Sequence, residues 1–575
     1  RKIRRLSLDY VVLTVSGPLP ERSEPPRSFI QRLLPLPSGP LSMQELNRRF
    51  GRIADAPNVK GVVLVFQGLS AGMATLQNFR RSIERLQEAG KVCVVYTPYL
   101  DMPHYLVASA ADRIVVPPSI IFNVLGLHSE AVYLKDGLSR IGVKAEVFQV
   151  SPYKGAYDAL DKSDITPEQK AQINWLLDES YDLIIQAIAD GRNMDQETVK
   201  NLIDEAPMSA EKALSAGLVD DLGYEDSLPL LLGENEKEEA AKNGQEEGDE
   251  AESDQPQRDN EDRLKARLYP WAQAENMLLE KARRPTRKFI GVVSLEGVIV
   301  MGPSRRPPIK IPIPFIGGIM AGEETIVRHL RAAEKNNRMA ALIIHVDSGG
   351  GSAVASDLIW RQIQRISQKK PVLFYMGNMA ASGGYYVGAA AKHIMAQSLT
   401  MTGSIGVVSV HVDTSNFFDM LNVNRVNFNR GKRAMLYTDS APLTEDGRQV
   451  MQNTIQDFYE QFKSVVADGR KLDKEELEPV SGGRVWTGSQ ALERQLLDSL
   501  GDFEDAIQKA ANLANLPVED DLKLSVFNIR SRGQQHLLPR AFEPAEGLNQ
   551  LISLEYLRNF IDQPLYLMPF EFKLW

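Results

Sequence analysis

Short apolar runs alternate with longer stretches of mixed polarity along most of the chain. Runs such as residues 61–66 (GVVLVF) and 372–375 (VLFY) are continuous and rich in β-branched or aromatic side chains, which is typical of strands buried on both faces of a parallel sheet. Helical stretches, including residues 76–89 and 355–369, separate these runs. The pattern predicts an α/β fold in which mainly parallel sheets are flanked by helices.

Two longer helical stretches, residues 166–190 and 444–468, occupy corresponding places in the two halves of the chain. Each begins at a threonine that is followed by an acidic residue within two positions. We expect Thr166 and Thr444 to cap these helices, because a threonine hydroxyl can accept a hydrogen bond from a free backbone N–H of the first turn.

The apolar pattern repeats at a spacing of about 280 residues, which is far longer than a solenoid period. Five blocks recur in the same order: residues 61–66 with 341–346, 91–96 with 370–375, 110–114 with 390–394, 189–192 with 467–470, and 218–223 with 496–501. The sequence therefore predicts two tandem copies of one domain, over residues 1–232 and 264–528.

Two segments of different composition belong to neither copy of the domain. Residues 233–263 are dominated by Glu, Asp, Gln, Asn and Lys, which predicts a disordered acidic linker because such a segment buries too little apolar surface to offset its ordering entropy. Residues 529–575 form a C-terminal tail with an apolar-rich run. The single cysteine, Cys93, excludes an internal disulfide, and a net charge of −9 argues against general nucleic-acid binding.

Chemistry is expected where the two copies differ. Residues 346–352 (VDSGGGS) follow a buried strand, and their consecutive glycines can expose backbone N–H groups to a developing oxyanion; the first copy has FQGLSAG there. Ser382 lies in residues 380–386 (AASGGYY), where the first copy has Met102. This serine is a candidate nucleophile, although it could instead cap the following helix. A third difference sets residues 400–406 (TMTGSIG) against the apolar IIFNVLG.

Together, the Ala-Ser-Gly-Gly-Tyr and Thr-Gly-Ser-Ile-Gly segments after a glycine-rich strand end resemble the signal peptide peptidase A (protease IV) family, peptidase family S49, in its long duplicated form. The resemblance implies two Clp-protease/crotonase-like domains and a serine peptidase with a Ser–Lys dyad. It assigns Ser382 as the nucleophile, Ser404 as the residue that orients the base, and the amides of Gly350 and Gly383 as the oxyanion hole. Gly349 stands where the family usually has proline.

Two lysines can be the base of this dyad. Residues 151–156 (SPYKGA) match the family's motif around its lysine in the first copy, with Gly155 replacing the usual serine, and this favours Lys154. Lys432 occupies the equivalent position in the second copy and is the alternative base. Either amine would have to be buried, because a lysine of ordinary pKa is protonated at neutral pH and accepts no proton.

The resemblance further implies an endopeptidase that degrades short hydrophobic peptides, such as cleaved signal peptides, through an acyl-enzyme and without a metal or other cofactor. It implies a homo-oligomer, a tetramer-like ring or dome. It also implies association with the bacterial inner membrane through a segment outside this sequence, with the catalytic body on the extracytoplasmic side. Two alternatives stay open. One is a crotonase-like acyl-CoA hydratase or isomerase, which would need catalytic carboxylates, and the other is a non-catalytic scaffold of the same fold.

Overall fold

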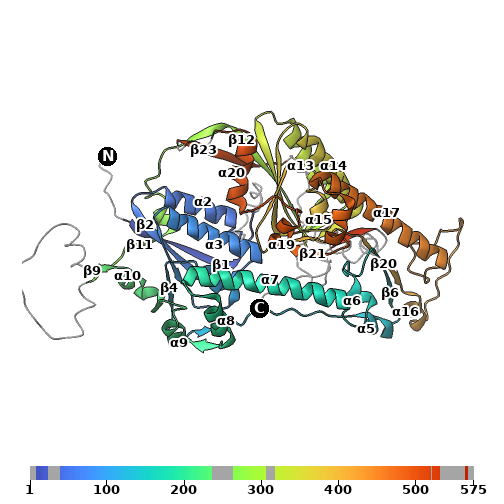
Figure 1. Cartoon of the computed structure of the whole chain (residues 1–575), viewed down its shortest axis with the longest axis horizontal. Coiled ribbons are helices and arrows are strands. Elements are labelled where there is room, and N and C mark those ends of the chain that lie inside the picture. Colours follow the sequence, from blue (N-terminus) through green and yellow to red (C-terminus); the bar gives the residue numbers. More distant parts are fainter. Residues whose placement is uncertain are drawn as a thin grey trace, which may run out of the picture. The chain divides into compact units, whose positions relative to one another are not determined.

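The computed structural model describes residues 8–23, 39–235, 263–305, 318–517, 519, 521–530 and 564–567 (Figure 1). The chain divides into two compact units. The first unit is built mainly from Arg1–Leu127 and Tyr181–Ala282, and the second from His128–Ser180 and Arg283–Lys573. Residues 128–180 come from the first half of the sequence and fold with the second unit, so the units do not follow the order of the chain. The predicted boundaries at residues 232 and 263 flank residues that lie almost wholly outside the described part.

The first unit contains a six-stranded sheet in which every neighbouring pair is parallel. Its strands consist largely of buried Val, Leu and Ile, in agreement with the continuous apolar runs of the sequence. Helices α2 (Met43–Ala54), α3 (Met73–Glu88) and α4 (Met102–Ala108) pack in the same unit. In spatial order the strands are β11 (Leu268–Pro270), β1 (Leu8–Pro18), β2 (Val59–Ser70), β3 (Val92–Tyr96), β4 (Arg113–Val116) and β8 (Asp221–Leu222).

The second unit repeats this strand order in its larger sheet. Parallel pairs join β23 (Leu522–Asn528), β12 (Arg284–Glu296), β15 (Met339–Ser348), β17 (Val372–Ala381), β18 (His393–Ala396) and β22 (Ser499–Leu500). Beyond β17 the sheet continues through β19 (Met401–Gly403) and the antiparallel β21 (Val485–Thr487). The shared order confirms the predicted α/β class and the duplication of one domain.

A second sheet of the same unit carries residues from three distant parts of the sequence. Its order is β14 (Met320–Gly322), β13 (Val298–Val300), β16 (Gly350–Ser352), β24 (Leu565–Leu567), β20 (Val408–Asp413) and β6 (Lys144–Gln149). Figure 1 shows β6 beside β20 at one end of the unit, and the two pair antiparallel from Lys144 with Asp413 to Gln149 with Val408. This pairing brings the segment that follows β6, including Lys154, into the second unit.

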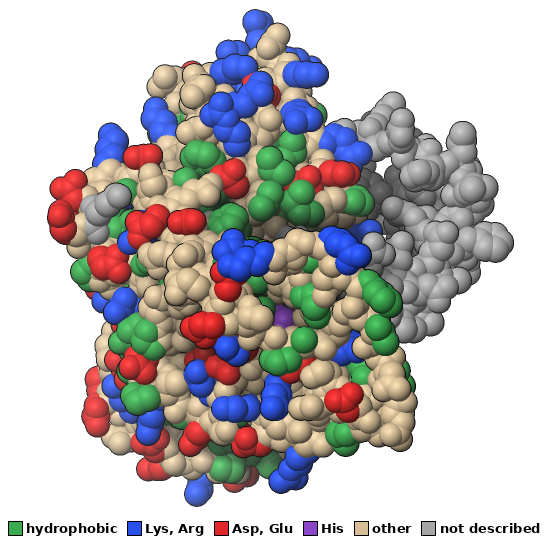
Figure 2. Space-filling model, turned by 90° about the vertical axis from the view of Figure 1, so that its right-hand side faces the viewer, with side chains coloured by type: hydrophobic (Ala, Val, Ile, Leu, Met, Phe, Trp, Pro, Cys, Tyr) green, Lys and Arg blue, Asp and Glu red, His purple; other side chains and the backbone are tan. Residues whose placement is uncertain are grey.

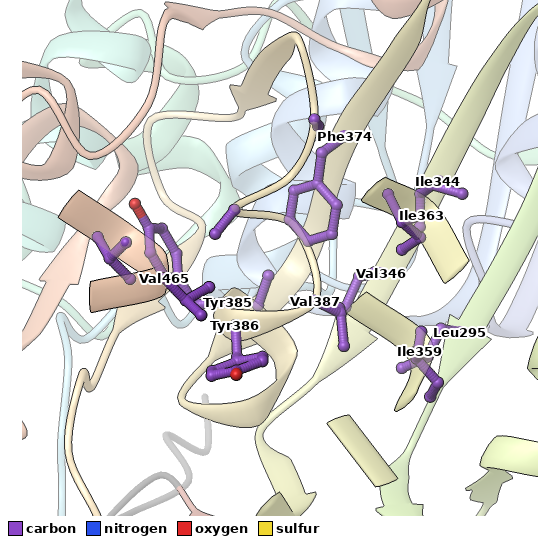
Figure 3. Packing of buried hydrophobic residues seen from close by; sticks show 14 of the residues in the cluster. Leu295, Ile344, Val346, Ile359, Ile363, Phe374, Tyr385, Tyr386, Val387 and Val465 are labelled. Atoms are coloured by element: carbon purple, nitrogen blue, oxygen red, sulfur yellow. The ribbon is translucent and has the colours of Figure 1, made fainter. Parts of the chain in front are cut away.

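Buried hydrophobic side chains join the larger sheet to its helices. Figure 3 shows Ile344 and Val346 of β15 and Phe374 of β17 facing Ile359 and Ile363 of helix α14 (Ala353–Ser367). The remaining helices of this unit include α13 (Glu323–Lys335), α15 (Gly383–Tyr386), α17 (Glu445–Arg470) and α20 (Phe503–Leu513).

The two long helices are present, as α7 (Pro167–Arg192) and α17. The predicted threonine caps are confirmed, because the Gln169 amide donates to Thr166 Oγ1 at 3.2 Å and the Gly447 amide to Thr444 Oγ1 at 3.1 Å. Among the described helices, none combines the length and the hydropathy needed to cross a bilayer. Most of the predicted acidic linker, residues 236–262, and most of the tail lie outside the described residues. The two ends of the linker pair as the antiparallel strands β9 (Glu234–Asn235) and β10 (Arg263–Leu264).

Candidate active site

Ser382 occupies the junction between β17, which ends at Ala381, and α15, which begins at Gly383. Its backbone is in a rare conformation for a residue with a side chain, with φ 55° and ψ −118°. Such a conformation costs on the order of 1–3 kcal/mol and persists only where the surroundings enforce it. Here the Ser382 amide donates to Gly403 O at 2.8 Å. The Ser382 side chain makes no capping hydrogen bond to α15, so the capping alternative is wrong for this serine.

The hydroxyl of Ser382 instead contacts Lys154. The distance from Lys154 Nζ to Ser382 Oγ is 2.7 Å, and the same nitrogen lies 2.7 Å from Ser404 O and 2.8 Å from Ser404 Oγ. All three side chains are completely buried. The structure therefore brings together Ser382, Lys154 and Ser404, the three side chains that the sequence motifs single out.

Burial determines the charge of this lysine, whose hydrogen-bond partners among the described residues are Ser382 and Ser404. Desolvation holds the pKa of Lys154 well below its usual value of 10.5. A neutral amine has two N–H donors and one lone pair. The donors suit the two oxygens of Ser404, and the lone pair suits the proton of the Ser382 hydroxyl. The geometry is that of a general base hydrogen-bonded to a nucleophile and oriented by a third group.

Helix α7 supports the backbone that carries Lys154. The Nε2 atom of Gln169 donates to Pro152 O and to Tyr153 O, both at 3.0 Å. Gln172 accepts a hydrogen bond from the Val485 amide at 2.8 Å, which ties α7 to strand β21. The residues before the lysine are thus held from the side of α7.

Two glycines lie close against the lysine. At Gly483, whose φ is +87°, an added Cβ would lie 2.6 Å from Lys154 Cβ and 2.7 Å from its Cα. At Gly406 an added Cβ would lie 3.2 Å from Lys154 Cδ. Ser151 Oγ also donates to Gly482 O. The backbone approaches the lysine so closely at Gly483 that only glycine fits there.

The sequence motifs did not reveal Gly483, Gln169 or Gln172. A signal for Gly483 was present, because Gly482 and Gly483 form a glycine pair directly before strand β21. Nothing in the local sequence distinguishes the two glutamines from solvent-facing residues of a helix, since their partners are backbone groups brought close by tertiary packing.

The two predicted oxyanion-hole amides differ in their surroundings. Gly383 is the first residue of α15, where the backbone N–H has no acceptor within the helix itself. Gly350, with φ +104°, donates its N–H to Ser348 Oγ at 3.1 Å. The Ser348 hydroxyl donates in turn to Gly297 O at 2.6 Å. The role of both amides stays a prediction.

Strand β24 occupies the edge of the glycine run. It pairs antiparallel with β16, opposing Leu565 to Ser352 and continuing through Gly351 to Gly350. On its other side Leu565 pairs with Val408 of β20, and β24 also contacts helix α15, which begins next to Ser382. The Leu565 side chain is buried among Ala156, Tyr157, Val408 and Val410. An extended peptide therefore fits between β16 and β20, with an apolar pocket for one of its side chains.

Lys432, the alternative base, lies elsewhere on the surface. Its side chain is 76% exposed, and Nζ forms an ion pair with Asp446 Oδ1 at 2.9 Å. An exposed ammonium group in an ion pair is a poor proton acceptor.

The first unit carries no nucleophile at the corresponding place. Met102, the counterpart of Ser382, is buried in helix α4. In the same helix His104 accepts the Leu69 N–H at 2.7 Å through Nε2, and its Nδ1 therefore carries the proton that is donated to Asp101 Oδ1. This histidine ties helix α4 to the end of strand β2.

Comparison with known proteins places both halves in one family. Residues 84–237 and 364–517 each match the model of Peptidase family S49. The chain is similar to the chloroplastic serine protease SPPA of Arabidopsis thaliana, with 30% identity over 498 residues that cover 84% of this chain and 67% of the relative. It is 29% identical to Protease 4 of Haemophilus influenzae over 470 residues, 80% of this chain and 71% of the relative. A putative signal peptide peptidase SppA of Enterococcus faecium is 29% identical over 185 residues, which cover 32% of this chain and 54% of the relative.

Proposed function

Because the chain belongs to peptidase family S49 and is a serine peptidase, we propose that its active site is a Ser–Lys dyad of Ser382 and Lys154. The observation that carries this proposal is the 2.7 Å contact between Lys154 Nζ and Ser382 Oγ inside a fully buried site. Ser404 orients the amine through its hydroxyl and its carbonyl oxygen.

Acylation follows from the protonation state of the lysine. The Ser382 oxygen attacks the carbonyl carbon of the scissile bond while its proton passes to the lone pair of Lys154 Nζ. The tetrahedral oxyanion is stabilised by the amide of Gly383, and a second donor from the glycine run requires that the Gly350 amide exchange Ser348 Oγ for the substrate. When the carbon–nitrogen bond breaks, the ammonium of Lys154 returns the proton to the leaving amine.

Deacylation repeats these steps with water. Lys154 accepts a proton from the water molecule that attacks the ester carbon, and then donates it to Ser382 Oγ as the acid product leaves. The lysine therefore acts twice as base and twice as acid, which requires an amine with a pKa near the working pH. The lowered pKa of Lys154 supports this cycle.

The substrate class in this proposal is short, hydrophobic, extended peptides such as cleaved signal peptides. The position of β24 supports this class, because an antiparallel strand there pairs through its backbone and places an aliphatic side chain in an apolar pocket. The relative whose name describes a signal peptide peptidase agrees with it. Peptides of this kind arise in membranes, so the proposed place of action is a membrane surface, and the side of the membrane stays a prediction.

The crotonase-like alternative receives no support from the groups around Ser382. Its chemistry would need a catalytic carboxylate, whereas the hydrogen-bond partners of the lysine in the described site are two serines. A buried amine beside a strained serine is a poor acyl-CoA hydratase site and a suitable acyl-transfer site.

Hydrolysis of a fluorogenic hydrophobic peptide tests the proposal. Wild-type protein should hydrolyse the peptide and should be labelled by a fluorophosphonate, and Ser382→Ala should lose both properties. The control variant Ser367→Ala removes a hydroxyl that donates to Ala390 O at the end of α14, and it should keep wild-type rates. Peptidase activity that survives in Ser382→Ala contradicts the proposal.

A further inference from the structure

Aromatic and arginine side chains form a row beside the segment that carries Lys154. Arg484 Cζ lies 4.2 Å from the ring centroid of Tyr153, the residue before the lysine. The centroid of the Tyr153 ring lies 5.9 Å from that of Trp175 in helix α7. The Trp175 ring in turn stacks on Trp486, with 5.3 Å between the centroids and 14° between the ring planes. We call these four residues, Arg484, Tyr153, Trp175 and Trp486, the aromatic ladder.

Hydrogen bonds to the backbone orient two members of the aromatic ladder next to Tyr153. Trp175 Nε1 donates to Val485 O at 3.1 Å, and Arg484 Nη1 donates to Ser481 O at 2.9 Å. A planar side chain whose N–H group is bound in this way is restricted to one orientation. The indole and the guanidinium therefore present fixed surfaces to the Tyr153 ring.

The outer members of the ladder also contact the backbone around the nucleophile. The Ser404 amide donates to Arg484 O at 2.6 Å. At Gly403, whose carbonyl oxygen accepts the Ser382 amide, an added Cβ would lie 2.8 Å from Trp486 Cδ1. Strand β21 and the residue before it thus support the backbone that carries both serines of the site.

Tyr153 connects the lysine to this support. A guanidinium over an aromatic ring is attracted by the ring electrons, and neighbouring aromatic rings attract one another in tilted arrangements. Both contacts of Tyr153 use its ring, and its hydroxyl group takes part in neither of them. Since Lys154 is the next residue, a ring held in one place restricts where the lysine side chain begins.

We propose that Tyr153 and Arg484 are positioning residues, which hold the amine of Lys154 against the nucleophile through the aromatic ladder. This role rests on the Ser–Lys dyad proposed above. Ser382 and Lys154 come from distant parts of the sequence, and the ladder contacts the backbone next to each of them. Such support matters for the reaction, because a displacement of about 1 Å in a reacting group costs roughly a hundredfold in rate.

Replacement of the two side chains tests this role. Tyr153→Leu removes the ring and should lower the rate at which a fluorophosphonate acylates Ser382 by at least about tenfold. Tyr153→Phe keeps the ring and should keep the wild-type rate. Arg484→Met removes the guanidinium, keeps the backbone bond to Ser404 and should also lower the rate. The double variant should be about as slow as the slower single variant, because residues that act through one shared contact are not additive.

Peptide kinetics separate positioning from a purely structural role. For hydrolysis of a hydrophobic peptide, kcat should fall in Tyr153→Leu and in Arg484→Met while KM stays close to the wild-type value, because the peptide still binds and the proton transfer is impaired. The urea midpoint of unfolding shows which variants are folded in the assay. If Tyr153→Leu does not fold, Arg484→Met decides the question, since the Arg484 side chain is only half-buried.

Arg425→Met is the matched control. Arg425 Cζ lies 4.2 Å from the centroid of the Phe418 ring, the same distance as in the pair of Arg484 and Tyr153. Phe418 belongs to helix α16 (Ser415–Met420), at the end of the second unit that faces the viewer in Figure 2, where Lys and Arg side chains are spread over the surface among hydrophobic and acidic ones. Loss of this contact should leave kcat and the acylation rate at their wild-type values.

Failure of the ladder is distinguishable from failure of the dyad. Wild-type rates in folded Tyr153→Leu and Arg484→Met, together with an inactive Ser382→Ala, overturn the positioning role and leave the dyad intact. Equal losses in Tyr153→Leu and Tyr153→Phe also overturn it, because the hydroxyl group and not the ring would then be responsible. Activity that survives in Ser382→Ala contradicts the dyad itself.

Discussion

Two adjacent glycines next to Lys154, the proposed base, allow the position of this lysine to be changed without a change in its chemistry. Gly482 and Gly483 both have left-handed backbone conformations, with φ +69° and +87°. In Gly483→Ala the new Cβ would lie 2.6 Å from Lys154 Cβ. In Gly482→Ala the nearest atoms are side-chain atoms of Arg484 and Ser151 at 3.2 Å. The pair differs mainly in whether the added methyl group presses on the lysine.

The structure gives the expected size of the effects of these two variants on stability and on reaction rate. Each alanine in a left-handed conformation costs about 1–2 kcal/mol of folding free energy, so both variants should be destabilised. Only Gly483→Ala must also displace Lys154, by about 1 Å, to restore ordinary contact between carbon atoms. A displacement of about 1 Å in a reacting group costs roughly a hundredfold in rate. We therefore expect kcat/KM to fall about a hundredfold in Gly483→Ala and only slightly in Gly482→Ala.

The assay is the rate of acylation of Ser382 by a fluorophosphonate, measured alongside hydrolysis of a hydrophobic peptide and the urea midpoint of unfolding. The unfolding data show whether each variant is folded under the assay conditions. Equal acylation rates in folded Gly482→Ala and Gly483→Ala would refute the conclusion that the position of Lys154 limits the reaction.

Four further predictions concern the same site and the strand β24 beside it. Ser404→Ala removes one hydrogen bond from the amine, worth about 0.5–1.5 kcal/mol, and should lower kcat/KM up to about tenfold without affecting the urea midpoint in proportion. Because burial lowers the pKa of Lys154, kcat/KM should rise with pH and reach its plateau well below pH 10.5. Between the lowered pKa and 10.5, unfolding takes up a proton at this lysine, so stability should rise with pH in wild-type protein and less steeply in Lys154→Met. A chain that ends at Gln563 lacks β24 and should have a lower KM for peptides than one that ends at Leu567, which keeps the strand; equal KM values would show that β24 does not compete with substrate.

The sequence contained most of what is needed to identify the fold. Continuous apolar runs such as residues 61–66 are conspicuous because strands buried on both faces need apolar side chains at every position. The repeat strengthened the prediction, because each apolar block in one half of the sequence has a counterpart in the other half. The same comparison located Ser382, because Met102 stands in its place in the first copy.

The surroundings of the two candidate lysines could not be predicted from the sequence in this way. Lys154 and Lys432 occupy equivalent positions in the repeat, and they differ in what packs around them: one is fully buried against Ser382 and Ser404, and the other is exposed beside Asp446. That difference is produced by the pairing of β6 with β20, two strands that come from different halves of the sequence. Contacts of such sequence separation depend on tertiary packing and leave no local pattern.

The central claim is that Lys154 is the base for Ser382, and one comparison tests it most directly. The rate at which a fluorophosphonate acylates Ser382 should be measured at neutral pH in wild-type protein, Lys154→Ala and Lys432→Ala. We predict a loss of about 10²–10⁴-fold in Lys154→Ala, the usual contribution of a general base, and a wild-type rate in Lys432→Ala. Loss of acylation in Lys432→Ala with retention in Lys154→Ala would contradict the account.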